Sequence, residues 1–433
     1  MGLFRKNVLI FPGGTEVGQE IFRSLRYCKE VNLFAVSSGV KQHAPFVFEH
    51  YREIPPVTDP DCLAALLTVI ADWQIDCIYP ANSLVIDFLN VHRDAMGCQM
   101  ILPSPEVLQV TRSKRATYKL LQSVVPVPEI IETIDADTRF PVFLKPDALY
   151  GSQGTRIVHS LPEFEALQPM EPGMLVSEFL PGQEFTVDCF SNHAGELLFA
   201  RPRTRERIRM GTSMHSEPVD GRIQTVLLEH AQRIQQSIPL RGGWFFQMKE
   251  DERGELKLLE VEARIAGTMA LRRVMGINFP LLSIMDAFAL PVRINPLNAS
   301  VRIDRALTNR YLHDLSYDRV YVDLDDTLIV HDRLNLQLVH FLFQCINQRK
   351  RIELISKSLA PDPDRVLEYW RIRQLFDAVH WLREEESKAD YIRPGNAIFI
   401  DDSFSQRLEI ERRCNIPVFD SSMIELLLDD RKG

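Results

Sequence analysis

Two carboxylates and a guanidinium lie close together in residues 256–270, where apolar positions and flanking glycines predict a strand. Glu260 and Glu262 are two residues apart, which in a strand places both on one face, about 7 Å apart. Arg264 continues that face. Carboxylate oxygens bind hard cations, and a guanidinium binds the phosphate that such cations neutralise. The pattern indicates either a metal and phosphate site or a solvated strand face with alternating charge.

A lysine ends another predicted strand. Residues 140–145 are mostly apolar, Lys145 is the last of them, and residues 147–156 form a loop of small residues. Such a pair can bind phosphates, because the ammonium group is a point charge and the loop offers backbone N–H groups. An ordinary hairpin turn has the same composition, so the loop does not identify a phosphate site by itself.

Two further carboxylates bracket a turn. Residues 174–179 and 184–190 read as strands, with Pro181 and Gly182 between them. Glu178 and Glu184 lie on either side of this turn. We expect them to suit the edge of a bound adenine and ribose.

Arginines recur at every second position shortly afterwards. They are Arg201, Arg203, Arg205, Arg207 and Arg209. In an extended chain all five would share one face, where like charges repel one another unless an anion is bound. Because the guanidinium fork matches carboxylates and phosphates, we expect Arg203, Arg205 and Arg207 to bind an anionic substrate. A solvated charged face is the alternative.

A second group of acids follows a strand near residue 320. An apolar run ends in Asp323 and Asp325, at the carboxyl end of the strand, where open α/β sheets place their sites. Asp323 can act as a nucleophile towards phosphorus, and Asp325 can be its acid and base partner. Later polar residues in similar positions are Ser356 after residues 352–355, Lys388 after a charged helix, and Asp401 and Asp402 after residues 397–400. Asp323, Asp401 and Asp402 could hold one Mg²⁺, with Ser356 and Lys388 on a phosphate.

The elements that position these residues begin with a βαβ alternation. Strands are expected at residues 7–11, 31–36 and 77–79 and helices from residue 21 and over residues 63–70, which predicts a parallel sheet covered by helices. Gly13, Gly14 and Gly18 lack the dinucleotide-binding spacing, and Ser37 and Ser38 stand where a ribose-binding acid is expected. A tight strand-to-helix turn is therefore favoured over a nicotinamide site.

A helix start follows at Ser104, Pro105 and Glu106, which provide an N-cap, a first helical proline and an acid in the first turn. The helical pattern continues over residues 111–123 and carries Lys114. With 433 residues, the chain is too long for one core. We expect domains at residues 1–103, 104–312 and 313–433.

Composition narrows the class of protein. The net charge of −9 argues against a general nucleic-acid binder. Seven cysteines stand at no metal-ligand or redox spacing, which suggests reduced thiols in the cytoplasm. No apolar run is long enough to span a membrane, and we expect no membrane partner.

The first two thirds of the chain resemble the ATP-grasp superfamily, in its carbamoyl-phosphate-synthase-like branch. The resemblance rests on residues 144–146, 151–154, 177–184 and 260–264, which stand in the family's order and spacing over about residues 1–300. It implies that Lys114 and Lys145 hold the phosphates of ATP, with Ser152 and Gly154 in the phosphate-binding loop. Glu178 would contact the adenine and Glu184 the ribose.

The same resemblance implies that Gln247, Glu260 and Glu262 coordinate two Mg²⁺ (or Mn²⁺) ions and that Arg264 contacts the transferring phosphate. Two positions depart from the family pattern. Glu262 replaces an asparagine, and Ala263 replaces a proline. Glutamate is still an oxygen ligand, so metal binding is expected to survive the change.

From about residue 318 the chain resembles the haloacid-dehalogenase-like (HAD-like) phosphatases. Asp323 and Asp325, Ser356, Lys388, and Asp401 with Asp402 match the four motifs of that superfamily in order. The resemblance implies a nucleophile at Asp323 and a Mg²⁺ site that also includes Asp325. No more than about 30 residues separate successive motifs, too few for a folded cap, so the site is expected to be open.

Together these features predict an α/β and α+β multidomain enzyme with a Rossmann-like N-terminal domain, an ATP-grasp fold and a capless Rossmannoid HAD-like domain. The grasp part would join a small carboxylate to an amine through an acyl phosphate, with ATP and Mg²⁺, and the C-terminal part would hydrolyse a phosphate ester. Three alternatives remain: the grasp part is a nucleotide sensor, it is a kinase, or the C-terminal part is only structural. A homodimer is possible.

Overall fold

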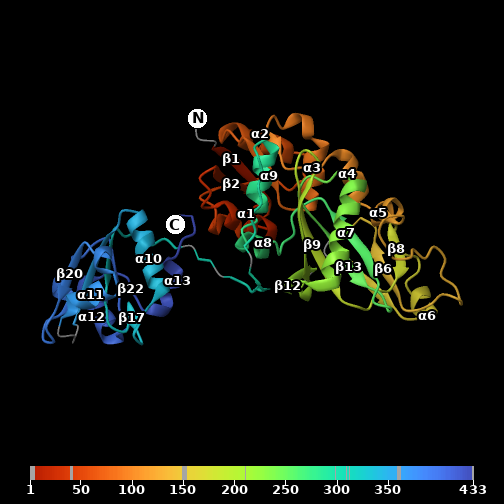
Figure 1. Cartoon of the computed structure of the whole chain (residues 1–433). Helices are drawn as coiled ribbons and strands as arrows, with labels where there is room; N and C mark the ends of the chain where they lie inside the picture. The colour runs from red at the N-terminus through yellow and green to blue at the C-terminus, as the bar shows by residue number, and fades with distance from the viewer. Residues whose placement is uncertain are drawn as a thin grey trace. The chain divides into compact units, whose positions relative to one another are not determined.

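The computed structural model describes residues 5–39, 42–148, 154–209, 211–297, 299–308, 310–311, 313–357 and 362–431. Within it the chain divides into two compact units (Figure 1). The first comprises residues 1–44 and 50–307, and the second comprises residues 45–49 and 308–433. In the described ranges no helix combines the length and the apolar character needed to cross a membrane.

The first unit begins with a parallel sheet in the order β3-β2-β1-β4-β5. Its strands are β1 (Lys6–Phe11), β2 (Val31–Ser37), β3 (His50–Glu53), β4 (Cys77–Pro80) and β5 (Gln99–Met100), and its helices are α1 (Glu16–Leu25), α2 (Cys62–Asp72) and α3 (Ser83–Val91). The strands and helices predicted here are confirmed. The chain leaves β1 and β4 in opposite directions, and Thr15 and Asn82 cap the helices that follow them. Gly18 permits a tight turn, since a Cβ there would lie 2.5 Å from the Pro12 carbonyl oxygen.

The helix predicted over residues 111–123 is wrong as a single element. The structure has α4 (Pro105–Thr111) and α5 (Lys114–Leu121), separated at Ser113. Ser113 has extended backbone angles, and its side chain accepts a hydrogen bond from the Ala116 N–H. This N-cap begins a new helix whose first residue is Lys114.

A small antiparallel sheet follows in the order β7-β6-β8. Its strands are β6 (Val142–Pro146), β7 (Arg156–Val158) and β8 (Met174–Glu178), with the short helix α6 (Leu161–Glu165) between the last two. Lys145 is therefore inside β6, one residue before its end.

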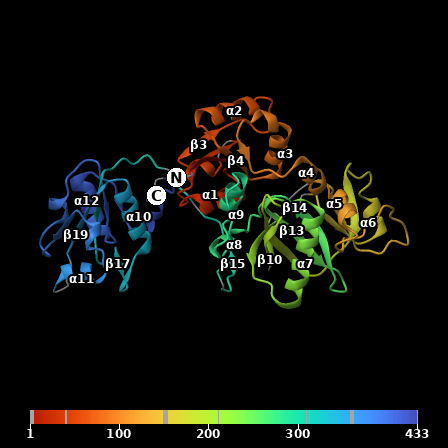
Figure 2. The same cartoon turned by 45° about the horizontal axis from the view of Figure 1, so that its top comes forward.

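A larger antiparallel sheet has the order β10-β9-β13-β14. Its strands are β9 (Glu184–Ser191), β10 (Leu197–Thr204), β13 (Gly242–Glu250) and β14 (Leu256–Glu262). Helix α7 (Gly221–Ser237) covers one face (Figure 2), where Phe185, Val187 and Cys189 join the core. Because side chains alternate along a strand, Glu184, Thr186 and Asp188 point to the opposite face. A three-stranded sheet of β11 (Glu206–Arg209), β12 (Thr212–Ser216) and β15 (Ile303–Asp304), and helices α8 (Ala270–Val274) and α9 (Phe279–Ala287), complete this unit.

Two predictions about strand faces are wrong. Strand β14 ends at Glu262, so Arg264 lies beyond it and does not continue its face. The five arginines do not share one face either, because β10 ends at Thr204 and Arg207 has a φ of +43°. A left-handed residue changes the direction of the chain and breaks the two-residue alternation.

The second unit is a parallel sheet in the order β20-β19-β16-β21-β22. The strands are β16 (Arg319–Val322), β19 (Arg351–Ser356), β20 (Ala378–Trp381), β21 (Ala397–Ile400) and β22 (Val418–Phe419), with a hairpin of β17 (Ile329–Val330) and β18 (Arg333–Leu334) and helices α10 (Leu336–Asn347), α11 (Pro363–Tyr369), α12 (Phe404–Cys414) and α13 (Ile424–Leu427). The predicted strands that end in acids are confirmed. The charged helix predicted before Lys388 is wrong: those residues form β20 and a turn.

Candidate functional site

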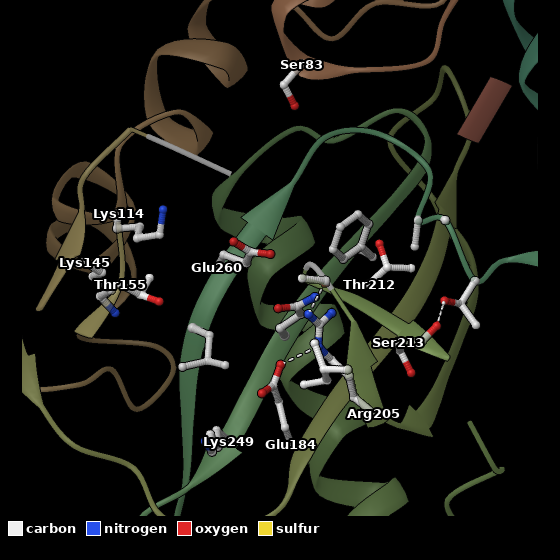
Figure 3. A pocket seen from close by; sticks show the side chains of 18 of the residues that line it. Ser83, Lys114, Lys145, Thr155, Glu184, Arg205, Thr212, Ser213, Lys249 and Glu260 are labelled. Carbon is white, nitrogen blue, oxygen red and sulfur yellow. Dashed lines mark hydrogen bonds and ion pairs between the residues drawn. The ribbon is translucent and has the colours of Figure 1, made fainter. Parts of the chain in front are cut away.

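A cavity of about 630 Å³ lies within the first unit. Its walls come from the N-terminal parts of α1 and α3, the small sheet, the larger sheet and the segment after β14. In Figure 3, Lys114, Lys145 and Thr155 lie on one side of Glu260, and Thr212 and Ser213 lie on the other. The cavity therefore has a cationic part and a part lined with hydroxyl groups.

Lys145 is buried, and its Nζ donates a hydrogen bond to the hydroxyl of Tyr118 at 2.7 Å. Burial, together with the nearby charge of Lys114, lowers the pKa of Lys145 to about 8. Tyr118 in turn donates to the carbonyl oxygen of Leu259 at 2.7 Å. Tyr118 thus links Lys145 to the strand that carries Glu260. No pattern in the sequence indicated Tyr118, which is an aromatic residue on a helix.

Asp147 sets the position of Lys114. The carboxylate of Asp147 accepts from the Ser113 hydroxyl at 2.7 Å and from the Arg115 N–H at 2.8 Å. These bonds fix the start of α5 beside the end of β6, and the Nζ of Lys114 lies 3.4 Å from the Asp147 carbonyl oxygen. Both lysines therefore line the cavity, as the proposed phosphate contacts require.

The predicted loop is described only in part. Ser152 lies outside the described residues. Gly154 has a φ of +68°, and a Cβ there would lie 3.2 Å from the Pro146 side chain. A side chain would be strained at this position.

Glu178 and Glu184 both line the cavity, but each has a cationic partner. Glu178 pairs with Lys257 at 3.0 Å and accepts from the Glu129 N–H. Glu184 pairs with Arg205 at 2.6 Å. Burial raises the pKa of Glu184, and Arg205 opposes the rise.

Gln247 and Glu260 are directly opposite each other on β13 and β14. With its amide oriented to satisfy its neighbours, Gln247 donates to Glu260 at 3.1 Å and accepts from Arg205 at 2.8 Å. Glu260 lines the cavity, whereas Glu262 is buried and does not line it. Glu262 pairs with Arg264 at 3.1 Å. Burial raises the pKa of Glu262, with Arg264 opposing and Glu260 adding to the rise.

Arg264 lines the cavity although it lies outside the strand. Its Nε donates to the Ser83 hydroxyl at 3.1 Å. Ser83 is the first residue of α3, so Arg264 connects the larger sheet to the N-terminal sheet.

The arginines expected to bind an anion separate into different environments. Arg203 and Arg205 line the cavity. Arg207 does not line it, and its exposed side chain pairs with Asp304 at 2.8 Å. Arg203 is buried and forms two bonds to Asp188, at 2.9 and 3.2 Å.

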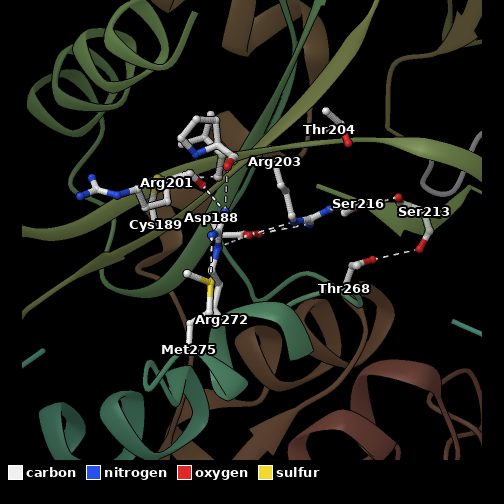
Figure 4. A network of polar contacts seen from close by, with 12 residues as sticks. Asp188, Cys189, Arg201, Arg203, Thr204, Ser213, Ser216, Thr268, Arg272 and Met275 are labelled. Atoms are coloured by element: carbon white, nitrogen blue, oxygen red, sulfur yellow. Dashed lines mark hydrogen bonds and ion pairs between the residues drawn. The ribbon is translucent and has the colours of Figure 1, made fainter. Parts of the chain in front are cut away.

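Asp188 also binds Arg272, at 3.0 Å, so two guanidinium groups share one carboxylate (Figure 4). Neither Asp188 nor Arg272 was predicted. Asp188 lies on the same polar face of β9 as Glu184, four residues earlier. The alternation of polar and apolar residues along this strand could have indicated Asp188. Arg272 lies 84 residues further along the chain and carried no such signal.

The second unit brings its predicted acids together. One carboxylate oxygen from each of Asp323, Asp401 and Asp402 lies within 4.8 Å of the others. Lys388 pairs with Asp323 at 2.7 Å and with Asp401 at 2.6 Å. Burial raises the pKa of Asp323 to about 6, with Asp401 adding to the rise and Lys388 opposing it. Carboxylate oxygens so close together form a donor set that suits a divalent cation.

The other predicted residues of this unit lie at strand ends or near them. Ser356 is the last residue of β19 and is buried, whereas Asp325 is exposed two residues after Asp323. Thr327 was not predicted. It accepts from the Asp402 N–H at 2.9 Å and thereby fixes the acidic segment after β21.

Comparison with known proteins agrees with this fold. Residues 170–306 match the family described as "ATP-grasp in the biosynthetic pathway with Ter operon". The 3-methyl-D-ornithine–L-lysine ligase of Methanosarcina mazei is 30% identical over 122 residues, which are 28% of this chain and 30% of the ligase. The carbamoyl phosphate synthase large chain of Clostridium botulinum is 28% identical over 177 residues, covering 38% of this chain and 16% of the synthase. Each match thus spans less than a third of its relative.

Solved structures extend the likeness over the first unit. Biotin carboxylase from Campylobacter jejuni has a TM-score of 0.56 at 18% identity, covering 66% of this chain and 72% of that one. The biotin carboxylase domain of the Hydrogenobacter thermophilus 2-oxoglutarate carboxylase, with MgADP and bicarbonate, has a TM-score of 0.55 at 15% identity, covering 67% and 71%. The first unit therefore shares the fold of these biotin carboxylases, and residues 170–306 within it match the ATP-grasp family described above.

Proposed function

We propose that the first unit is an ADP-forming carboxylate–amine ligase that works through an acyl phosphate. The observation that carries this proposal is the convergence of Lys114, Lys145, Glu260 and Arg264 on one cavity. They come from α5, β6, β14 and the segment after β14, and their charges suit a polyphosphate and its cations.

The relatives support this class of reaction. Two of them are named as an amino acid ligase and a carbamoyl phosphate synthase. Two solved neighbours hold ADP, one of them with magnesium. We therefore assign ATP and Mg²⁺ as cofactors.

The residues present fit a divalent cation. Gln247 and Glu260 face each other across two strands, and Glu260 offers a carboxylate oxygen in the cavity. Gln247 would offer its amide oxygen in place of the bond it accepts from Arg205, and Glu262, beside the cavity, would offer a second carboxylate near Glu260. These three residues would hold Mg²⁺. When bound, the cation neutralises charge on the phosphates during transfer.

The bond changes follow from the groups in the cavity. An oxygen of the substrate carboxylate attacks the γ-phosphorus of ATP, the bond to the β,γ-bridging oxygen breaks, and ADP leaves. Lys145 and Arg264 stabilise the transferring phosphoryl group. The amine then attacks the acyl carbon, phosphate leaves, and the nitrogen loses a proton to solvent.

The test is to incubate the protein with ATP, Mg²⁺, mixed small acids and hydroxylamine as a general amine. We expect ADP, phosphate and a hydroxamate in equal amounts. AMP as the nucleotide product would contradict the proposal. A phosphorylated acceptor that forms without any amine would favour the kinase alternative, and nucleotide binding without turnover would favour the sensor.

For the second unit we propose a Mg²⁺-dependent phosphatase, because Asp323, Asp401 and Asp402 converge with Lys388 at one edge of the parallel sheet. A carboxylate oxygen of Asp323 attacks the phosphorus, and the bond to the leaving oxygen breaks while Asp325 protonates that oxygen. Water then attacks the phosphorus of the aspartyl phosphate and gives a proton to Asp325, the bond from phosphorus to the Asp323 oxygen breaks, and phosphate leaves. Release of phosphate from aryl phosphates tests this activity, and its absence would leave a structural domain.

A further inference from the structure

The cluster of Asp188, Arg203 and Arg272 carries an uncompensated positive charge beside the cavity (Figure 4). The exposed fractions of these residues are 1%, 2% and 2%. Two guanidinium groups share a single carboxylate, so the buried group has a net charge of +1. A buried charge is stable only when it is paired and hydrogen-bonded.

The two arginines of the cluster differ in which of their N–H groups remain available to a ligand. Arg272 bonds to Asp188 through Nε, and its Nη2 donates to the carbonyl oxygens of Arg201 at 2.8 Å and Pro202 at 3.0 Å. It does not line the cavity. Its nitrogens are directed at the protein, so we assign it a structural role.

Arg203 does line the cavity. Its Nε and Nη2 hold Asp188, and its Nη1 donates to the Ser216 hydroxyl at 3.2 Å. Each terminal nitrogen of a guanidinium carries two hydrogens, so each retains one donor beyond these bonds. Because Asp188 fixes the plane of the guanidinium, these donors are already oriented before a ligand binds.

Thr186, which lies behind the cavity wall and does not line the cavity itself, is a second polar residue beside Arg203. Thr186 lies directly opposite Arg203 in the pairing of β9 with β10, so the two side chains share a face. Thr186 is fully buried, and within the part of the chain that the structure describes its hydroxyl has no hydrogen-bond partner. A buried hydroxyl without a partner is costly, and an anion on Arg203 could accept its proton.

The nearby wall is small and polar. Ser213 and Thr268 line the cavity, and the Ser213 hydroxyl lies 3.2 Å from that of Ser216. Glu16 borders the same part, since a Cβ on Gly267 would lie 3.8 Å from its carboxylate and 3.9 Å from Arg305. Glu16 and Arg305 form an ion pair at 3.2 Å. This part of the cavity thus offers the Arg203 guanidinium at one point and the ion pair of Glu16 and Arg305 at another.

We propose that Arg203 binds a non-reacting carboxylate of an α-amino acid substrate. The cluster's charge of +1 matches a monoanion, and the guanidinium fork matches a carboxylate. The amino group would share the Glu16 carboxylate with Arg305. The inference rests on the proposed ligase function, because it makes the amino acid the amine that attacks the acyl phosphate. Arg203 then orients that amine without touching the reacting atoms.

The experiment measures melting temperatures with MgADP and each of the twenty protein amino acids, or its carboxamide. At least one amino acid should stabilise the wild-type protein, and its carboxamide should bind at least tenfold more weakly. Arg203→Lys should lose the stabilisation by that amino acid. Arg272→Lys is the matched control: it removes the other guanidinium from Asp188, lowers the melting temperature without ligand, and keeps the shift.

Each outcome decides the question. No stabilisation by any amino acid, equal binding of acid and carboxamide, or equal loss in both variants would overturn the proposal. If Arg203→Lys does not fold, the comparison of acid and carboxamide on the wild-type protein still decides. ADP formation with hydroxylamine is measured separately. A protein that binds amino acids but forms no ADP therefore contradicts the ligase function and not the proposed role of Arg203.

Discussion

Two buried lysines, one in each unit, have opposite electrostatic surroundings. Lys145 and Lys388 are both 4% exposed. The partner of Lys145 is the neutral Tyr118 hydroxyl, and burial lowers its pKa to about 8. Burial also acts to lower the pKa of Lys388, but Asp323 and Asp401 outweigh it and the pKa is raised.

The difference indicates different roles. The neutral partner of Lys145 does not compensate its charge. The ammonium group is therefore available for an electrostatic interaction with an incoming anion. The charge of Lys388 is already compensated, so this lysine holds two carboxylates near each other and would shield a phosphate from them. One site is built around a cation and the other around acids.

The largest expected effect comes from removing the proposed nucleophile of the acidic site. Asp323→Asn should lower phosphate release about a thousandfold or more, as loss of a nucleophile does in other enzymes, and leave ADP formation unchanged. The measurement is hydrolysis of an aryl phosphate alongside ADP release. Asp332→Asn, in the hairpin of the same unit, makes the same charge change outside the cluster and should be active. If Asp323→Asn also stops ADP formation in a folded protein, the two sites are not independent.

Removing the lysine of the cationic site should have a smaller effect. Lys145→Ala should slow ADP formation roughly 10- to 100-fold, which corresponds to about 1.4–2.7 kcal/mol of lost transition-state binding. Lys119→Ala removes an exposed lysine from the neighbouring helix α5 and should change nothing. Phosphate release by the second unit should be unaffected. An unchanged rate of ADP formation in Lys145→Ala would remove this residue from the site.

The pKa of Lys145 predicts how nucleotide binding depends on pH. With a pKa of about 8, the lysine is mostly charged at pH 7 and mostly neutral at pH 9. Since ADP prefers the charged form, the affinity for MgADP should fall about tenfold over this interval. Lys145→Arg carries a charge throughout, so its affinity should change much less. Equal slopes for the two proteins, measured by calorimetry, would show that Lys145 does not bind the phosphates.

The comparison also shows what the sequence could predict. Both sites sit at strand ends that the apolar runs predicted, and Lys145, Glu260, Asp323 and Asp401 lie at or near such ends. Local patterns failed where one residue changed the course of the chain, as Ser113 did by capping a new helix.

Residues that act through distant partners had no sequence signal. Tyr118 contacts Leu259, 141 residues away, and Arg272 contacts Asp188 across 84 residues. The pattern of arginines drew attention to Arg203 but implied a repeating face. Its actual environment depends on Asp188, which only the pairing of β9 with β10 brings beside it.

The smallest expected effect tests whether Glu262 is a Mg²⁺ ligand of the cationic site. Glu262→Ala should raise the Mg²⁺ concentration for half-maximal ADP formation several-fold, because one oxygen ligand near Glu260 is lost. Glu262→Asn should restore most of the wild-type value, since an amide oxygen can still coordinate. Glu255→Ala removes an exposed acid just before the same strand and is the control.

Glu262 also pairs with Arg264 at 3.1 Å. If the Mg²⁺ dependence stays constant while the KM for the acid rises, Glu262 acts only by positioning Arg264, and Glu260 with Gln247 must hold the cation without it.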